Sequence, residues 1–434
     1  MEAKIRAEWD RLAHVVVRHP GIEFFFGLLD PKSSLFERYF DFSEACNEHS
    51  DLIGKLERND VKVDHLDEIV VRAAENDKSL FKELLEKAIE KISFKGHKRL
   101  ARRAYKRFKE NAHLLDKKQL FEIMMLRPVV KLSKPQHEKT VYAQTTIKNP
   151  PSNLCFMRDQ QAVTDRGLVI GRMAKVQRAY ESTITEFALN KLGVQPLYKI
   201  RADGTFEGGD FIPAGSFAML GCGKRTNREA VNQMLTHCLG FDEVAVVSQP
   251  AHPKLGVVDE MMNMHLDTYV NIAGKDIAVG NVEMMSNAKL KVYRRRNDGT
   301  YAGNDTDDLY SYLTTKKNFQ VVNITELEQM CYASNFLCIS DKRIICADVE
   351  AIAPSVLDNL KRELPRKPAK LRWKYEALHT QASRTSENLK ARNEFFPNKP
   401  ELVSLGVSAE KVKLTQITGA YGATHCLTCV LVRQ

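Results

Sequence analysis

The hydrophobic pattern at the start of the chain predicts a β-α-β unit. The sequence LAHVVVRHP, from Leu12 to Pro20, is a β-branched run that Pro-Gly closes, which indicates a strand that enters a turn. Residues 36–58 carry an uneven apolar face typical of a helix, and residues 61–66 (VKVDHL) alternate as a half-buried strand does.

Residues 69–127 differ from the segments on either side. Ala, Leu, Lys and Glu dominate, no Gly or Pro falls between Ile69 and Lys95, and a single Gly follows at position 96. Strong helix formers without helix breakers predict several helices. We therefore expect residues 69–127 to form an inserted helical domain.

Beyond Val129, β-branched runs return between turn signals, and helical patterns at residues 178–192 and 227–238 separate them. The clearest runs are LVIGRM, FAMLGCG, VAVVS, TYVNIAG and FLCIS. This alternation indicates an α/β body. Residues 364–400, rich in Pro, Lys, Arg and Asn, are expected to form a long loop with one helix, and no period of about 20–50 residues is strong enough to indicate a repeat.

The composition indicates an ordinary globular protein. The 434 residues, 43% hydrophobic and 28% charged, allow two or three domains or one large domain with an insertion. No apolar run is long enough to span a membrane, and the first ten residues are too charged for a secretory signal. Nine scattered cysteines are interpreted as reduced thiols, so we expect a cytoplasmic protein without a membrane partner.

The formal net charge of +10 raises the question of a nucleic-acid partner. Much of the excess falls between Lys95 and Arg107, where only Tyr105 and Phe108 could stack on bases. A solvated helix face is the simpler interpretation. A salt series would test for nucleic-acid binding, which we do not expect.

Four short segments gather acidic, His, Gly or Cys residues, namely 153–159 (NLCFMRD), 206–210 (FEGGD), 264–268 (MHLDT) and 422–429 (GATHCLTC). In 206–210, the paired glycines permit close backbone approach, and the flanking carboxylates of Glu207 and Asp210 could bind a cation or act as a base, although a solvated turn is the commoner outcome.

Taken singly, the other segments also have ordinary explanations. On a strand, His265 and Asp267 would project from one face and could share acid-base work, but a structural His is more common. Cys426 could be a small core residue. Cys426 and Cys429 match Cys-x-x-Cys, yet no second pair completes a zinc site.

Together and in this order, the segments resemble the arginine deiminases of the guanidino-group-modifying (pentein) superfamily. The family's signatures recur in 10–12 (DRL), 18–21 (RHPG), 158–159 (RD), 207–210 (EGGD), 265–267 (HLD) and 425–426 (HC). The resemblance extends from about residue 8 to the C-terminus and is weakest in residues 69–127 and 345–415.

The resemblance implies a complete catalytic set. Cys426 would be the nucleophile and His265 the general acid and base. Glu207 would contact both His265 and the substrate, and Asp159 and Asp267 would hold the guanidinium.

The resemblance also implies the substrate-binding residues. Arg178 and Arg225 would meet the substrate α-carboxylate, and Asn153 and Phe156 would line the pocket. Asp210 is included in this group. For the two arginines an exposed charge remains the alternative.

The chemistry explains these residue types. A guanidinium has a pKa above about 12, so its central carbon is a poor electrophile. Two carboxylates can bind and orient the planar cation, a thiolate can attack its carbon, and an imidazolium can protonate the departing nitrogen. No metal or organic cofactor is expected, and thiolate formation should be coupled to substrate binding because carboxylates surround the sulfur.

One position departs from the family. Bacterial arginine deiminases commonly carry Arg where this chain has Tyr421. The exact guanidino substrate is therefore open. The choice between a deiminase, an amidinotransferase and an arginine dihydrolase is also open, because all three use the same Cys, His and carboxylate residues. A protein that kept the fold and lost turnover is a further alternative, which retention of the nucleophile disfavours.

The resemblance implies a five-bladed, pseudo-symmetric α/β propeller formed by residues 1–68 and 128–434, with the helical domain 69–127 inserted. It also implies a homo-oligomer that acts on a small molecule, L-arginine or a related guanidine. Residues 415–425 are expected to form a mobile loop at the entrance.

Overall fold

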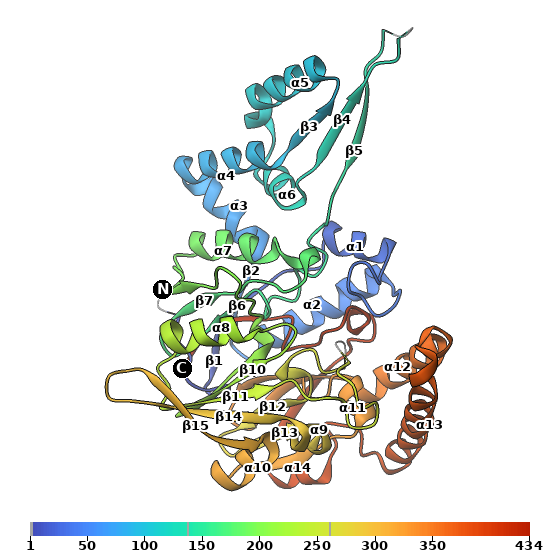
Figure 1. Ribbon diagram of the computed structural model, residues 1–434. Helices are drawn as coiled ribbons and strands as arrows, with labels where there is room; N and C mark the ends of the chain where they lie inside the picture. Colours follow the sequence, from blue (N-terminus) through green and yellow to red (C-terminus); the bar gives the residue numbers. More distant parts are fainter. Residues whose placement is uncertain (1–2, 137–138, 260–261) are drawn as a thin grey trace.

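A lobe of helices and one small sheet projects from an α/β body in the computed structural model of this chain, which describes residues 3–136, 139–259 and 262–434 (Figure 1). Within those residues, the body contains five three-stranded units that share one pairing pattern. In each unit the first strand pairs antiparallel with the second, and the second pairs parallel with the third. A parallel pair needs a crossover connection, which helices supply between the second and third strands.

Four of the units follow one another along the chain. Their strands are β6 (Gln161–Val163), β7 (Leu168–Ile170) and β8 (Tyr198–Lys199); β9 (Phe211–Ala214), β10 (Phe217–Cys222) and β11 (Glu243–Ser248); β12 (Val270–Gly274), β13 (Ile277–Gly280) and β16 (Gln320–Asn323); and β17 (Leu337–Ser340), β18 (Arg343–Ala347) and β19 (Ser408–Val412). The helices of these units are α7 (Glu181–Lys191), α8 (Arg228–Gln233), α9 (Val282–Asn287), α10 (Leu309–Ser311), α11 (Glu326–Met330), α12 (Val349–Glu363), α13 (Ala369–Arg392) and α14 (Pro400–Ser404). A hairpin of β14 (Lys289–Arg295) and β15 (Tyr301–Asp308) extends the second sheet by antiparallel pairing with β11.

The fifth unit joins the two ends of the chain. The last strand, β20 (Cys429–Arg433), pairs antiparallel with β1 (Leu12–Val17), which pairs parallel with β2 (Lys62–His65). Helices α1 (Ile22–Leu29) and α2 (Phe42–Arg58) make the crossover. The β-branched side chains of β1 are fully buried at residues 15–17, so this strand lies inside the core and holds the C-terminal strand in place.

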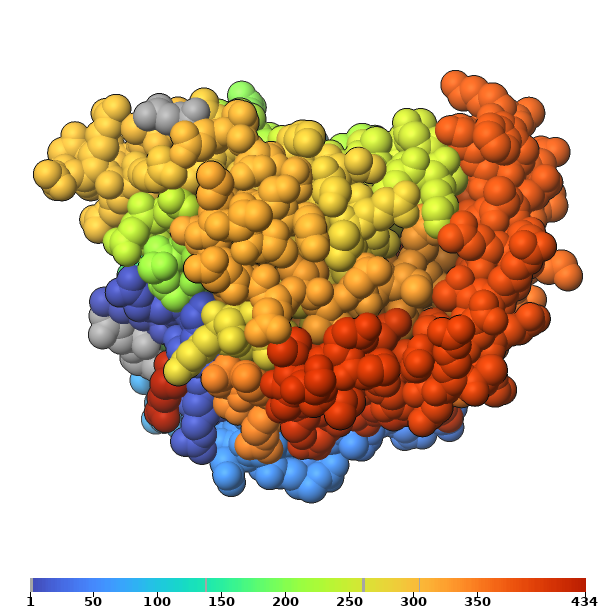
Figure 2. Space-filling model, turned by 90° about the horizontal axis from the view of Figure 1, so that it is seen from below, coloured from blue at the N-terminus to red at the C-terminus, as the bar shows by residue number. Residues whose placement is uncertain are grey.

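The strands predicted from β-branched runs are confirmed, because each run contains one of β1, β7, β10, β11, β12 and β17. Two predicted segments differ. The helix expected over residues 36–58 begins only at Phe42, because the Asp41 side chain accepts a hydrogen bond from the Glu44 amide (2.9 Å) and caps the helix there. The one helix expected in residues 364–400 is present, but this helix, α13, has 24 residues and takes most of the segment that was expected to be a long loop. It lies in the orange-red ridge at the right of Figure 2 and ends where Asn393 turns left-handed (φ 55°).

The projecting lobe contains α3 (Leu66–Asn76), α4 (Lys78–Lys91), β3 (Ser93–Gly96), α5 (Lys98–Asn111), α6 (Lys117–Leu126), β4 (Val129–Ser133) and β5 (Tyr142–Thr146). The helices predicted here are present, but β3 is a strand that pairs parallel with β4, and β4 pairs antiparallel with β5. Phe94 of β3 packs against Tyr105 and Phe108 of α5, which explains why this stretch is extended between helices. From Lys98 onward the basic run lies on α5, a helix with no buried residue, and Lys95 lies on β3.

None of the helices in the described ranges combines the length and the apolar character that crossing a membrane requires.

Candidate active site

The chemically rich segments occupy the same place in different units. Each one lies directly before the first strand of its unit, as residues 153–159 before β6, 207–210 before β9, 265–268 before β12 and 422–426 before β20. The remaining unit places Asn335 in the same position, before β17. Because the units repeat one strand arrangement, these equivalent positions meet at a single buried site.

The strand predicted for His265 and Asp267 is wrong. His265 is extended, but Leu266–Thr268 form a 3-10 turn that β12 follows, and the Thr268 hydroxyl donates to the His265 carbonyl (2.6 Å). The Asp210 carboxylate accepts a hydrogen bond from the Leu266 amide (3.1 Å) and ties this turn to the neighbouring unit. Local capping of a tight turn therefore outweighs the extended pattern, and the turn still carries both side chains into the site.

The five residues predicted as catalytic lie together and are buried. His265 Nε2 is 2.9 Å from Glu207 Oε2, and His265 Nδ1 is 3.6 Å from Asp159 Oδ1. The Cys426 thiol donates to Asp267 Oδ2 across 3.7 Å, and its side chain is 3% exposed. The imidazole thus lies beside two of the carboxylates, and the thiol lies beside the third.

Opposing charges tune the imidazole. Burial on its own would lower the pKa of His265, but Asp159, the hydrogen bond with Glu207 and the charge of Asp210 outweigh burial and raise its pKa from 6.5 to about 9. Burial would raise the pKa of Glu207, yet Arg225 and the protonated His265 hold that pKa well below its ordinary value. At neutral pH the pair is an imidazolium bound to a carboxylate, which is poised to donate a proton.

The thiol has the opposite bias. Burial first, and then the negative charges of Asp267 and Asp159, raise the pKa of Cys426 well above 9.0, while a hydrogen bond from Asn335 acts against them. Near neutral pH the thiol is therefore protonated in this structure. A cation placed between the sulfur and the two aspartates would offset their charge and favour the thiolate.

Two buried oxygens of this cluster, Asp159 Oδ1 and Asp267 Oδ1, accept no hydrogen bond from the residues that the structure describes. The second oxygen of each carboxylate is held, by Arg178 Nη1 at Asp159 (2.6 Å) and by His425 Nδ1 at Asp267 (2.8 Å). A buried carboxylate oxygen without a donor is costly. The pair therefore suits a ligand that brings N–H donors and positive charge.

Arg178 and Arg225, the two residues predicted to bind the substrate α-carboxylate, each pair with a carboxylate of the site. Arg178 pairs with Asp159 and, through Nε, with Glu181 (2.8 Å), and Arg225 Nη1 lies 3.4 Å from Glu207 Oε2. Burial raises the pKa of Glu181 to about 7 although Arg178 opposes this. Arg178 Nη2 and Arg225 Nε have no hydrogen-bond acceptor among the described residues, so each keeps a donor for an anionic group.

A small cavity, called the inner cavity below, adjoins Asp159, Arg178 and Arg225. It is lined by the predicted residues Asn153, Phe156, Asp159, Arg178 and Arg225 together with Leu35, Met264, Ala420 and Tyr421. Its volume is about 10 Å³, roughly the space of one water molecule. Predicted Asp210 does not line it and instead holds the turn that carries His265, as described above. The inner cavity is too small for an amino acid in this conformation.

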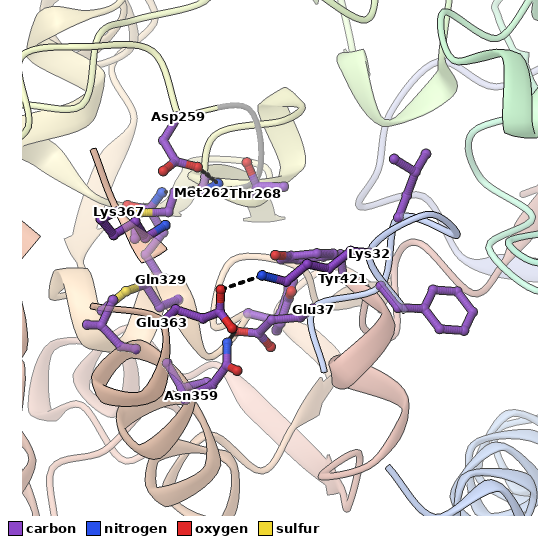
Figure 3. Close-up of a pocket in the computed structure, with 16 residues that line it drawn as sticks. Lys32, Glu37, Asp259, Met262, Thr268, Gln329, Asn359, Glu363, Lys367 and Tyr421 are labelled. Atoms are coloured by element: carbon purple, nitrogen blue, oxygen red, sulfur yellow. Dashed lines mark hydrogen bonds and ion pairs between the residues drawn. The ribbon is translucent and has the colours of Figure 1, made fainter. Parts of the chain in front are cut away.

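A larger outer cavity of about 320 Å³ adjoins the inner one and shares Leu35 and Tyr421 with it. Figure 3 shows Tyr421 beside Lys32, whose ammonium pairs with Glu363 (2.6 Å). Leu35 and Tyr421 both have left-handed backbones, with φ of 61° and 68°, a conformation that non-glycine residues rarely adopt. These two residues form the wall between the cavities.

Asp159, Glu207 and His265 also place potential ligand atoms within 4.8 Å of one another, as a metal site would. A histidine that binds a metal ion must be neutral, because the metal takes the lone pair of a ring nitrogen. A pKa of about 9 keeps His265 protonated near neutral pH. Arg178 and Arg225 already pair with Asp159 and Glu207, and their positive charge works against a metal ion at these carboxylates.

Three residues that shape the site were not assigned a role from the sequence. Asn335 has no acidic or His neighbour in its segment, and only its place before the FLCIS strand could have indicated it. Glu181 stands three residues after Arg178 at the start of α7, a helical spacing that suits an ion pair. His425, noted only as part of a signature, donates to the carboxylate that faces Cys426.

Comparison with known proteins agrees with this arrangement. The family model for arginine deiminase matches residues 32–433. The arginine deiminase of Halobacterium salinarum is 25% identical, with 86% of this chain and 94% of that protein covered. A putative arginine deiminase of Mycoplasma pneumoniae is 24% identical over 67% of this chain and 71% of that protein.

Among solved structures, the N-terminal domain of ArgZ, an arginine dihydrolase from cyanobacteria, matches with a TM-score of 0.51 at 14% identity and 98% coverage of both chains. The two chains therefore share the α/β pentein fold. Because the family model spans far more than half of the sequence, this chain belongs to the arginine deiminase family of guanidino-group hydrolases.

Proposed function

We propose that this protein hydrolyses the guanidinium group of L-arginine to L-citrulline and ammonia. The buried oxygens Asp159 Oδ1 and Asp267 Oδ1, which accept no hydrogen bond from the described residues, support this function most directly. A guanidinium presents its N–H donors in one plane, and two carboxylates can take them as charge-assisted hydrogen bonds. Cys426 lies 3.7 Å from one of these carboxylates, within reach of the carbon that they would hold.

The first half of the reaction forms a covalent intermediate. The bound cation offsets the charges that raise the pKa of Cys426, so the thiol releases its proton to solvent on binding and becomes the thiolate. The thiolate attacks the central carbon and forms a C–S bond. The bond from this carbon to a terminal nitrogen then breaks as the His265 imidazolium gives that nitrogen a proton, and ammonia leaves.

The second half regenerates the enzyme. The neutral His265 takes a proton from water, whose oxygen attacks the carbon of the S-linked amidino intermediate. The C–S bond breaks as the new hydroxyl group loses its proton to solvent, so that the C=O bond of the ureido product forms and the thiolate leaves. Glu207, 2.9 Å from His265 Nε2, orients the imidazole in both halves.

The other end of L-arginine would meet Arg178 and Arg225. Both line the inner cavity, and Arg178 Nη2 and Arg225 Nε keep donors that bond no described residue. An α-carboxylate would replace part of the charge that Asp159 and Glu207 now supply to them. Asn153 and Phe156 complete the lining.

Product analysis tests this function. Wild type, Cys426→Ala and Cys429→Ala are incubated with L-arginine, with and without an added amine, and citrulline, ornithine and ammonia are followed. Cys429 is a matched control, because it is a buried cysteine of β20 that contacts none of the catalytic side chains described above. Equal citrulline and ammonia from wild type and Cys429→Ala, but not from Cys426→Ala, supports the proposal.

The other outcomes contradict it in distinct ways. Ornithine in place of citrulline would identify a dihydrolase, and transfer of the amidino group to the added amine would identify an amidinotransferase. Wild type without turnover would direct the search to agmatine, methylated arginines and peptidyl arginine.

We propose further that the units close into a five-bladed propeller around the site. Five units with one pairing pattern, and the pairing of β20 with β1 that joins the chain ends, support this closure. The inserted lobe then spans about residues 66–146, beyond the predicted 69–127, because β4 and β5 pair with β3. We also expect a cytoplasmic homo-oligomer. Light scattering of the purified protein would test the oligomeric state.

A further inference from the structure

We propose that Asn335 is a catalytic residue that stabilises the Cys426 thiolate through its side-chain amide. Asn335 Nδ2 donates a hydrogen bond to Cys426 Sγ across 3.1 Å, and the residue is fully buried. The inference rests on the proposed function in so far as Cys426 is the nucleophile there. It goes beyond that function by assigning the sulfur a side-chain donor from the fourth unit; the Asp267 carbonyl is a second, more distant acceptor of the same Nδ2 (3.5 Å).

The orientation of the amide follows from its other partners. Asn335 Oδ1 accepts hydrogen bonds from the backbone amides of Ala423 (3.1 Å) and Cys426 (3.2 Å). Reversing the amide would set its NH₂ group against two N–H donors and its oxygen against the sulfur. The donor therefore has to face Cys426 Sγ.

The backbone of Asn335 fixes the same turn. Its carbonyl accepts from the His425 amide (3.0 Å) and from the Thr424 hydroxyl (3.0 Å). Side chain and backbone thus bind the Ala423–Cys426 segment from both sides. The donor is held in place before any substrate arrives, which is the condition for effective electrostatic stabilisation.

A neutral donor suits this site for a chemical reason. Asp267 and Asp159 work against the thiolate, and a Lys or Arg beside the sulfur would counter them but would also repel a cationic substrate. The Asn335 amide counters them without a net charge. It acts when the thiolate forms and again when the thiolate is expelled from the intermediate, because a stabilised thiolate is a better leaving group.

The central test is the reactivity of Cys426 in Asn335→Asp, a nearly isosteric change that keeps an oxygen for Ala423 and Cys426 and replaces the donor with a carboxylate oxygen. Alkylation by iodoacetamide is followed against pH, and fragmentation of the peptide in the mass spectrometer separates alkylation of Cys426 from that of Cys429, three residues later, and of the other thiols. At pH 7 we expect alkylation at least roughly tenfold slower than in wild type, with the midpoint of the pH profile moved upward. An unchanged midpoint would overturn the proposal.

Asn271→Ala is the matched control. Asn271 is also a buried asparagine, and its amide donates to the Phe336 carbonyl (2.9 Å), one residue beyond Asn335, without a hydrogen bond to the sulfur. Its alkylation profile should match wild type although thermal unfolding shows a loss of stability. A shift as large as in Asn335→Asp would attribute the effect to packing and would overturn the proposal.

Two further measurements keep the test decisive. If Asn335→Asp does not fold, wild type and Cys426→Ala are labelled with [¹⁵N]asparagine, and the NMR signals of their asparagine side-chain amides are compared over a range of pH. In wild type only, the signal of one asparagine side-chain amide should shift with pH around the midpoint of alkylation. If no signal shifts in this way, the proposal is overturned. Alkylation needs no arginine, so a thiolate effect without arginine turnover would support the role of Asn335 while it contradicts the proposed function.

Discussion

Glu207→Gln tests how the carboxylates control His265. Glu207 Oε2 lies 2.9 Å from His265 Nε2, and the imidazole must be protonated when ammonia leaves. Removing the negative charge while keeping the shape should lower the pKa of His265. Because the protonated form is the active one, the high-pH limb of the activity profile should move to lower pH.

The size of the shift follows from the charges around the ring. The pKa of His265 rises from 6.5 to about 9, which corresponds to roughly 3 kcal/mol. Asp159 and Asp210 remain in the variant and keep part of this effect. Arg225 and Arg178, 3.4 and 3.8 Å from Glu207 Oε2, lose that partner and act against the imidazolium. We therefore expect a downward shift of at least about one pH unit.

The assay is kcat/KM for L-arginine from pH 5 to pH 10, with the His265 ring followed by NMR. Wild type should lose activity as pH rises through about 9, and Glu207→Gln should lose it at lower pH. Glu181→Gln is the control, because Glu181 binds Arg178 and has no hydrogen bond with His265. The reasoning is refuted if the high-pH limbs of the two activity profiles coincide and NMR gives His265 the same pKa in wild type and in Glu207→Gln.

Four other perturbations have defined outcomes. Asp267→Asn removes a charge that raises the pKa of Cys426, so alkylation at pH 7 should accelerate while arginine turnover falls roughly a hundredfold or more; slower alkylation would contradict this. Tyr421→Ala removes part of the wall between the two cavities, so a bulky thiol reagent should reach Cys426 faster than in wild type or Tyr421→Phe. Prolonged dialysis against a chelator should leave activity unchanged, because Arg178 and Arg225 already pair with Asp159 and Glu207 and their charge opposes a metal ion there; recovery only after metal is added would contradict the account. Asp41→Ala removes the cap of α2 and should lower the free energy of unfolding by roughly 0.5–2 kcal/mol without loss of activity, as chemical denaturation would measure.

Local patterns were sufficient for most strands and for the residue types of the site. β-branched runs between turn signals predicted β7, β10 and β12, and His265 and Asp267 both reach the site although the backbone there is a turn and not the predicted strand. The repeat could not be seen in the same way. The connection from β7 to β8 carries one α-helix, α7, whereas the one from β18 to β19 carries α12, α13 and α14, so no fixed period links the units.

The missed residues have a common physical cause. Asn335 is an ordinary amide until the fold sets it beside Cys426 Sγ, and Glu181 is an ordinary helix residue until burial sets it against Arg178. Sequence spacing records neighbours along the chain, but these contacts join residues of different units or depend on desolvation. Only the topological position, directly before the first strand of a unit, would have drawn attention to Asn335.

The most direct test of the account is to quench wild type with acid during turnover of L-arginine and to analyse the intact protein and its peptides by mass spectrometry. Catalysis through Cys426 predicts an adduct of the mass of arginine minus ammonia on the peptide that contains Cys426, absent from Cys426→Ala and retained in Cys429→Ala. Citrulline formation by Cys426→Ala, or turnover with the adduct on another residue, would contradict the central claim.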